Sequence, residues 1–218
     1  MTSDFHRHVG VILAGGLGRR MGGGDKPLIA LGGRPMLDRV IERLRPQVDR
    51  LVLNANGDLE RFGAYDLPVV PDSIEGFAGP LAGLHAGMRW AQANVPEARF
   101  IVSAAADTPF FPGNLVQRLA ASGADAEDTI ALAASPAGTH PVFGRWPLAV
   151  TDALEDFLKT GESGKILVFA DRYIRLNVPF EEIELPSGET VDPFFNVNTP
   201  EDAARAEEIA AVLEARAA

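Results

Sequence analysis

The sequence contains no cysteine among its 218 residues. That absence excludes disulfide bonds, thiolate metal sites and cysteine nucleophiles. The sequence also lacks any apolar stretch near the roughly 20 residues that a membrane-spanning helix requires. Residues 1–8 are polar and lack the apolar core of a signal peptide. We therefore expect a cytoplasmic protein with no membrane partner.

Basic residues are scarce, with 20 Lys and Arg against 30 Asp and Glu and a net charge of −10. Non-specific nucleic-acid binding needs a basic face, so we expect no nucleic-acid partner. Three basic residues, Arg19, Arg20 and Lys26, nevertheless lie close together in the sequence. A local basic cluster in an acidic protein predicts a focused site for an anionic ligand, commonly with a divalent cation.

The most informative segment is a glycine-rich loop that follows an apolar strand expected over 9–14. Six glycines there would let backbone N–H groups approach phosphate oxygens, and the three cations would neutralise the charge on those oxygens. The loop lacks the G-x-G-x-x-G pattern, because Met21 stands at the position of the third glycine. It is not a P-loop either, because Asp25 precedes Lys26 and Pro27 follows it. The segment therefore predicts a nucleotide site of a third kind.

Apolar strands alternate with helical patterns along the chain, and the strands read as continuous apolar runs. This pattern is typical of a mostly parallel sheet covered by helices on both faces. Strands are expected at 9–14, 51–53, 69–70, 100–102, 129–133, 139–144 and 173–178, and helices at 36–44, 81–91, 115–121, 148–158, 165–169 and 200–216. The 139–144 strand is expected to depart from the parallel order.

Polar or glycine residues follow four of these strands at their carboxyl ends: Gly15, Asn54, Asp72 and Asp107. Ligands of open α/β sheets bind at that edge. Because four separate segments converge there, we expect the ligand site at this edge.

The loop contains three short motifs, Leu13-Ala14-Gly15-Gly16, Arg20-Met21-Gly22 and Asp25-Lys26-Pro27-Leu28. Together they resemble the signature of nucleotidyltransferases of the molybdenum-cofactor guanylyltransferase type, the MobA-like family. Later matches to the family are Gly79-Pro80-Leu81-Ala82-Gly83, Asp107-Thr108-Pro109, His140-Pro141 and Asn196-Val197-Asn198-Thr199-Pro200. The resemblance covers nearly the whole chain and implies a single-domain, Rossmann-like three-layer α/β/α nucleotidyltransferase fold. We expect residues 1–8 to be a disordered tail, 9–134 the nucleotide-binding half and 135–218 the acceptor-binding half.

The family resemblance also implies roles for individual residues. Catalytic roles fall to Lys26, Arg20 and Asp107, and Asp107 would also hold Mg²⁺. The acceptor would be bound by His140, Asn196 and Asn198. Nucleotide contacts are expected from Leu13, Ala14, Gly15, Gly16, Lys26, Asn54, Asp72, Gly79, Gly83 and Asp107.

The implied reaction is transfer of GMP from GTP to molybdopterin, the phosphorylated pterin form of molybdenum cofactor, with release of pyrophosphate. Proteins that deliver molybdenum cofactor are further expected partners. Two alternatives share the fold: a molybdopterin cytidylyltransferase and a pyrophosphorylase acting on a sugar or polyol phosphate. A non-catalytic nucleotide-sensing module is an alternative from another class. Gly15-Gly16 after Ala14 favours guanine, since the cytidylyltransferases tend to carry L-A-A-G.

Several of these residues also have a purely structural interpretation. Asp107 could be the N-cap of a helix, Asp72 could form a turn, and Asn54 could form an Asx turn with its own backbone. The family often carries Gly-x-Arg in the acceptor half, whereas this chain has Lys165 in that region, which makes the acceptor less well defined than the nucleotide. Among the remaining histidines, His6 and His8 are assigned to the tail and His85 to the exposed face of its helix.

Overall fold

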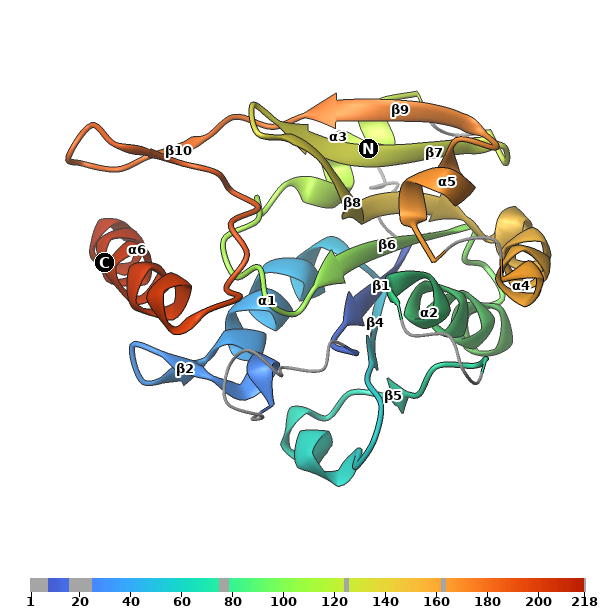
Figure 1. The fold of residues 1–218 in the computed structure, drawn as a ribbon, viewed down its shortest axis with the longest axis horizontal. Helices are drawn as coiled ribbons and strands as arrows, with labels where there is room; N and C mark the ends of the chain where they lie inside the picture. Colours follow the sequence, from blue (N-terminus) through green and yellow to red (C-terminus); the bar gives the residue numbers. More distant parts are fainter. Residues whose placement is uncertain (1–7, 16–24, 75–78, 124–125, 162–163, 218) are drawn as a thin grey trace.

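The computed structural model describes residues 8–15, 25–74, 79–123, 126–161 and 164–217, and a seven-stranded sheet forms its centre (Figure 1). In spatial order the strands are β5 (Val69–Val70), β4 (Arg50–Asn54), β1 (His8–Leu13), β6 (Phe100–Ala105), β8 (Gly138–Pro147), β7 (Thr129–Ser135) and β9 (Ile174–Pro179). Strand β8 runs antiparallel to β6 and β7, and the other pairs in this sheet are parallel. The predicted mostly parallel sheet and the reversed direction of β8 are both confirmed.

Helices cover both faces of the sheet, which gives the predicted three layers. The helices are α1 (Met36–Leu44), α2 (Pro80–Asn94), α3 (Leu115–Ala121), α4 (Thr151–Thr160), α5 (Ile166–Ala170) and α6 (Pro200–Ala217). Apolar side chains of α1 and α3 pack on one face, and those of α2, α4 and α5 pack on the other. Within the described part of the chain, no helix is long and apolar enough to cross a membrane.

The alternation of side chains along β1 explains why residues 9–13 carry no polar side chain. Val9 and Val11 join the core under α2, whereas Ile12 joins the core under α1, and all three are at most 1% exposed. A strand buried on both faces needs apolar residues at every position. This is why the sequence shows a continuous apolar run here.

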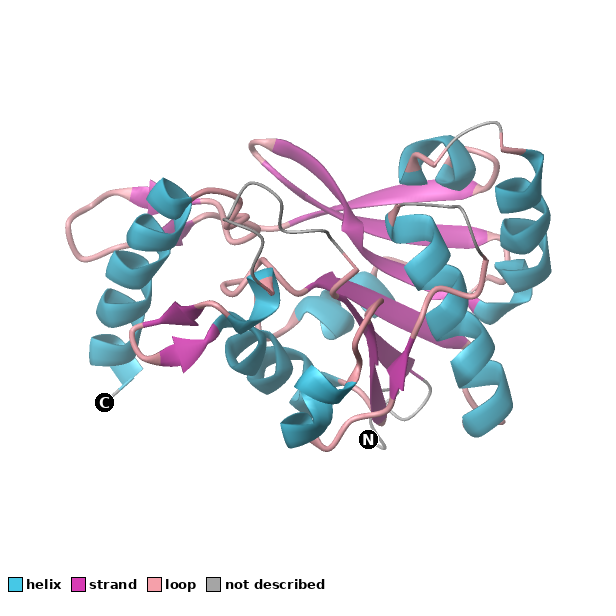
Figure 2. Ribbon diagram, turned by 60° about the horizontal axis from the view of Figure 1, so that its bottom comes forward, coloured by secondary structure: helices cyan, strands magenta, loops and turns pink. Residues whose placement is uncertain are grey.

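Helix α6 lies beside the main sheet and packs on two small ribbons at one end of the molecule (Figure 2). The ribbons are β2 (Ala30–Leu31) with β3 (Arg34–Pro35), and β10 (Ile183–Glu184) with β11 (Thr190–Val191). Leu31, Leu185 and Ile209 form part of a separate small core. The sequence pattern predicts the helix but neither ribbon, since two-residue strands carry almost no periodic signal.

Strand register brings the carboxyl ends of four parallel strands into line. Leu13 is opposite both Asn54 and Ala105, and Asn54 is opposite Val70. The segments that follow these strands therefore leave the sheet at one edge. This confirms the predicted convergence of Gly15, Asn54, Asp72 and Asp107 at that edge.

Two histidine assignments from the sequence were wrong. His8 belongs to β1, where it is 2% exposed and accepts a hydrogen bond from Arg145 Nε at 2.8 Å; residues 1–7 of the expected tail lie outside the described residues. His85 is also only 2% exposed. Its Nδ1 lies 2.6 Å from Ser73 Oγ, and its Nε2 accepts from Arg89 Nε at 3.2 Å. The apolar positions of α2 predicted one buried face, but this helix also buries the opposite side against Ser73 and α4.

The burial of His85 predicts a dependence of stability on pH. Burial lowers the pKa of His85, and the charge of Arg89 lowers it further despite the opposing effect of Glu155. In the unfolded chain the imidazole takes up a proton near pH 6.5. Below that pH the unfolded state binds more protons than the folded state. The contribution of the neutral, buried His85 to folding stability is therefore present above pH 6.5 and is lost as the pH falls below it. We expect the melting temperature to fall by a few degrees between about pH 7.5 and pH 5.5.

The variant His85→Asn should show a shallower fall, because Asn can still bond Ser73 but does not titrate. Burial also lowers the pKa of His140, so His140→Gln should flatten the curve independently and the double variant should be flattest. This prediction would be contradicted if the melting temperature of His85→Asn changed with pH as steeply as that of the unmodified protein.

Candidate functional site

Three predicted side chains from distant segments meet at the edge of the sheet. Lys26 Nζ lies 2.5 Å from Asp107 Oδ2 and 2.6 Å from Asn198 Oδ1. The side chains of Lys26 and Asp107 are 13% and 27% exposed, so the pair is reachable from solvent without being fully hydrated. An ammonium group thus occupies a point where a carboxylate and an amide oxygen converge.

The position of Asp107 follows from β6 and from the Asn196–Asn198 segment. Asp107 comes two residues after β6 ends, and its backbone carbonyl accepts a hydrogen bond from the N–H of Val197 at 2.9 Å. The hydroxyl of the buried Thr108 donates to Asn196 Oδ1. Helix α3 begins at Leu115 and its N-cap is Asn114. Asp107 is therefore not the N-cap of this helix, which removes that interpretation of the carboxylate.

Asn198 is held in place by the start of α6. The carboxylate of Asp202 accepts from the backbone N–H groups of Asn198 and Thr199 at 2.8 and 2.9 Å, while Thr199 Oγ1 accepts from the Asp202 N–H at 3.2 Å. This reciprocal arrangement confirms the predicted N-cap at Thr199. Val197 is buried, whereas its neighbours Asn196 and Asn198 are exposed residues.

A second polar group lies at the ends of β4 and β5. Asn54 Nδ2 donates to Asp72 Oδ1 at 2.9 Å, and Asn56 Nδ2 donates to Asp72 Oδ2 at 2.8 Å. The Asp72 N–H in turn donates to Asn56 Oδ1 at 2.9 Å. Both carboxylate oxygens retain further acceptor capacity. The group therefore presents a fixed carboxylate suited to the N–H edge of a base.

Two glycines pack directly against the amide side chains of this group. A Cβ on Gly83 would lie 2.1 Å from Asn54 Oδ1, so any larger residue would displace that amide. A Cβ on Gly15 would lie 3.5 Å from both Asn54 Oδ1 and Asn56 Nδ2. The first residue of the glycine-rich loop is thus adjacent to the amide pair. Gly79 lies farther along, where its Cβ would be 3.7 Å from the Gly164 carbonyl.

The first residues of the loop motif are held by backbone bonds. The N–H of Ala14 donates to the Asn54 carbonyl at 2.8 Å, and the Leu13 carbonyl accepts from the Ala106 N–H at 3.0 Å. Gly16 and Arg20, both predicted site residues, lie outside the described residues. Lys165 is exposed at the start of α5, next to Gly164.

Asn56 was not among the site residues predicted from the sequence. Its side chain is partly exposed, whereas that of Asn54 is buried against Gly83. The available signal was the spacing of two residues between the amides after a strand, which places both side chains on one side. The structure makes Asn56 the more accessible amide of the pair.

His140 lies in a neighbouring cluster rather than beside Lys26. Its Nε2 lies 2.7 Å from Ser135 Oγ, which donates to Asp192 Oδ2 at 2.6 Å. The ring of His140 stacks on Phe194 with centroids 4.4 Å apart. Ser135 ends β7, so the cluster lies at the same edge of the sheet as the end of β6. The predicted acceptor residues therefore have different partners: Asn198 bonds Lys26 and Asn196 bonds Thr108, whereas His140 contacts Ser135 and Phe194.

The oxygens near Lys26 are the donor types that a hard divalent cation prefers. Among the residues that the structure describes, no three His, Asp or Glu side chains gather as a metal cluster. Mg²⁺ commonly binds through one or two carboxylates and completes its shell with water and substrate phosphates. Asp107, with the amide oxygen of Asn198, fits that mode, and Lys26 Nζ marks the point where a cation is stabilised.

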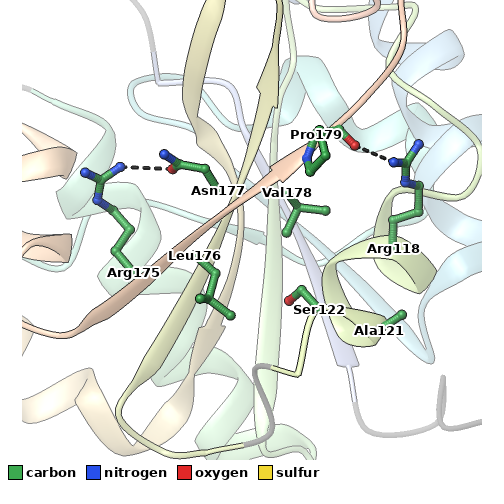
Figure 3. Close-up of a pocket in the computed structure, with 8 residues that line it drawn as sticks. All are labelled: Arg118, Ala121, Ser122, Arg175, Leu176, Asn177, Val178 and Pro179. Atoms are coloured by element: carbon green, nitrogen blue, oxygen red, sulfur yellow. Dashed lines mark hydrogen bonds between the residues drawn. The ribbon is translucent and has the colours of Figure 1, made fainter.

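A hollow of about 440 Å³ lies elsewhere, between α3 and the edge strand β9 (Figure 3). Arg118 donates to the Pro179 carbonyl at 2.5 Å there, and Arg175 donates to Asn177 Oδ1 at 2.9 Å. Strand β9 is separated from β6 by β8 and β7. None of the predicted site residues lines this hollow, and both of its arginines already have hydrogen-bond partners.

Comparisons with known proteins show which family this chain resembles. A family model described as the MobA-like NTP transferase domain matches residues 10–173. A molybdenum cofactor guanylyltransferase from Bradyrhizobium sp. (strain ORS 278) is 50% identical over 97% of this chain and 98% of its own length. Another from Mesorhizobium japonicum is 46% identical over 90% of this chain and 93% of its own length.

Solved structures show the same fold. The molybdopterin-guanine dinucleotide biosynthesis protein A from Archaeoglobus fulgidus matches with a TM-score of 0.72 and 26% identity, covering 93% of this chain and 98% of that one. A Mycobacterium tuberculosis protein solved in complex with manganese matches with a TM-score of 0.63 and 22% identity, covering 93% of this chain and 98% of that one.

Proposed function

Because the chain belongs to the MobA-like NTP transferase family, we propose that it transfers GMP from GTP to molybdopterin and releases pyrophosphate. The observation that carries this proposal is the convergence of Lys26, Asp107 and Asn198 beside the fixed carboxylate of Asp72. One group suits a triphosphate and the other suits a guanine edge. The named relatives at 44–50% identity support the same reaction.

In this proposal the terminal phosphate of molybdopterin attacks the α-phosphorus of GTP in line. The new P–O bond forms as the bond to the β-phosphate oxygen breaks, and pyrophosphate leaves with its electron pair. The attacking phosphate is already an anion, so no protein base has to remove a proton. The protein's contribution is then mainly positioning and electrostatic stabilisation.

Individual residues divide this work. Lys26, Arg20 and the N–H groups of the glycine-rich loop would hold the triphosphate and stabilise the departing pyrophosphate. Leu13, Ala14, Gly15 and Gly16 would line the nucleotide, with Gly79 beside it. Gly83 would contribute indirectly, because its missing Cβ makes room for the Asn54 amide. Asp72, supported by Asn54, would accept from the guanine N–H groups. Asn196, Asn198 and His140 would face the acceptor.

Nucleotidyl transfer from GTP generally depends on a divalent cation, and we propose Mg²⁺ for this chain. Asp107 would hold it, with Asn198 as a neighbouring oxygen donor. When bound, Mg²⁺ supplies positive charge that offsets the charge of the phosphate oxygens. The ammonium of Lys26 would then be free to contact the phosphates. We further propose a cytoplasmic location and proteins that deliver molybdenum cofactor as partners.

A thermal-shift panel of GTP, CTP, UTP and ATP with Mg²⁺ tests the nucleotide assignment. We expect the largest shift with GTP, because only guanine offers the adjacent N1–H and N2–H donors that match both oxygens of the Asp72 carboxylate. A nucleotide at 100 times its Kd stabilises by about 2.7 kcal/mol, which is roughly 5–10 °C for a chain of this size. Pyrophosphate release from GTP should in addition require molybdopterin.

The outcomes separate the alternatives. A larger shift with CTP than with GTP would contradict the guanine assignment and favour a cytidylyltransferase. Binding of GTP without pyrophosphate release in the presence of molybdopterin would favour a nucleotide sensor. Release that requires a sugar or polyol phosphate instead would identify a pyrophosphorylase of the same fold.

A further inference from the structure

Arg61 makes contacts with two segments that flank the candidate site. It lies in a 3-10 helix, Glu60–Tyr65, that follows the Asn54–Asn56 segment. Its Nη2 donates to the Asn56 carbonyl at 2.8 Å, and its Nη1 donates to the Asp58 carbonyl. On the other side, its Nε lies 2.9 Å from Asp25 Oδ1, an ion pair without the alignment of a hydrogen bond. The side chain is 21% exposed, so these contacts are made in a partly desolvated place.

Each end of this contact leads directly to a group assigned to the nucleotide. Asp25 immediately precedes Lys26, and its carbonyl accepts from the Leu28 N–H at 2.8 Å, which fixes Asp25 and Lys26 in one turn. Asn56 is locked to Asp72 by two reciprocal hydrogen bonds. A continuous series of contacts therefore joins Asp72 to Lys26 through Asn56, Arg61 and Asp25.

We propose that Arg61 is a positioning residue that fixes the spacing between the base-binding Asn56–Asp72 pair and the phosphate-binding Lys26. The inference rests on the proposed function, since it takes the ligand to be a guanosine triphosphate. A nucleotide has a limited span from base to phosphates, so holding both contact groups at one spacing lowers the cost of orienting it. A guanidinium suits this role because its planar fork can bond acceptors on several sides, which an ammonium does less well.

A purely structural role for Arg61 makes a different prediction. If Arg61 only bonded nearby carbonyls, its loss would lower the fraction of folded protein, and activity with every nucleotide would fall by the same factor. KM and base preference would then stay unchanged. The positioning role instead predicts changes in both, and these are the quantities to measure.

Arg175 supplies a matched control. Its side chain is 27% exposed, its Nε lies 2.5 Å from Asp171 Oδ1, and it also donates to Asn177. It lines the hollow on β9, away from the candidate site (Figure 3). The variants Arg61→Met and Arg175→Met therefore each remove a partly exposed, ion-paired guanidinium and keep an unbranched apolar side chain.

The experiment compares KM and kcat for GTP and for ITP, which lacks the 2-amino group, with Mg²⁺ and molybdopterin. For Arg61→Met we expect KM for GTP to rise roughly tenfold, as for loss of a charge-assisted bond, and the preference for GTP over ITP to fall. Arg175→Met should change neither quantity. Arg61→Lys, which keeps the charge near Asp25 without the fork, should lie between Arg61→Met and the unmodified protein.

Two further variants test separately the partners of Arg61 on the base side and on the phosphate side. Asn56→Ala should reduce the GTP preference, whereas Asp25→Asn should raise KM for both nucleotides alike. The double variant Arg61→Met with Asp25→Asn should show little further rise in KM, because both changes remove the same ion pair.

Calorimetric measurement of GTP binding to the unmodified protein separates failure of the proposed function from failure of the positioning role of Arg61. Absence of GTP binding would overturn the proposed function and this inference with it. Normal GTP binding and turnover, together with an unchanged KM and an unchanged GTP preference in Arg61→Met, would overturn this inference alone.

Discussion

Replacing Lys26 by Ala is expected to lower turnover by roughly 10²-fold or more while the protein stays folded. The reason is that Lys26 is a preorganised cation at the point where charge develops on the leaving pyrophosphate, and loss of one such donor costs about 10²–10³ in rate. Its ion pair with Asp107 is partly exposed, so loss of the pair should cost only about 1 kcal/mol of stability, or roughly 2–4 °C in Tm. Steady-state pyrophosphate release and a melting curve measure the two quantities.

Lys159→Ala is the matched control for this variant. Lys159 Nζ lies 2.5 Å from Glu155 Oε1, the same separation as in the Lys26–Asp107 pair, but it is 59% exposed on α4. Its removal should leave turnover unchanged. Turnover of Lys26→Ala close to that of Lys159→Ala would mean that Lys26 is only an ion-pair partner of Asp107.

The variant Asp107→Asn is expected to abolish nearly all metal-dependent turnover. Asn keeps the shape of the side chain and can still accept from Lys26, but it lacks the charge that holds Mg²⁺. Loss of charge stabilisation worth several kcal/mol corresponds to a rate decrease on the order of 10³-fold. GTP binding should survive in part, because the glycine-rich loop and Lys26 remain.

Turnover measured across a Mg²⁺ titration decides this prediction. The rate of Asp107→Asn should stay low at every Mg²⁺ concentration, whereas Asp171→Asn should titrate like the unmodified protein. Asp171 is a suitable control because it also pairs with a cation at 2.5 Å, Arg175, but lies after α5 and away from the site. A wild-type rate with unchanged Mg²⁺ dependence in Asp107→Asn would refute the metal role.

The sequence by itself determined the layered fold and the edge where the site lies. Continuous apolar strands such as 9–14 require burial on both faces, and parallel strands end at a common edge. Gly15, Asn54, Asp72 and Asp107 could therefore be assigned to one edge from their places after strands. The glycine-rich motif also identified the family, because its residues are close together in the chain.

Only the tertiary structure determined which of these residues contact one another and which neighbouring residues hold them in place. Lys26 and Asn198 are 172 residues apart, and their contact depends on how α6 and the 196–198 segment return to β6. No periodic pattern encodes such a long-range contact. The burial of His85 likewise comes from Ser73 and α4, which lie outside its own helix. Asn56 and Arg61 matter through their partners Asp72 and Asp25, and a partner's position becomes known only when separate segments are packed together.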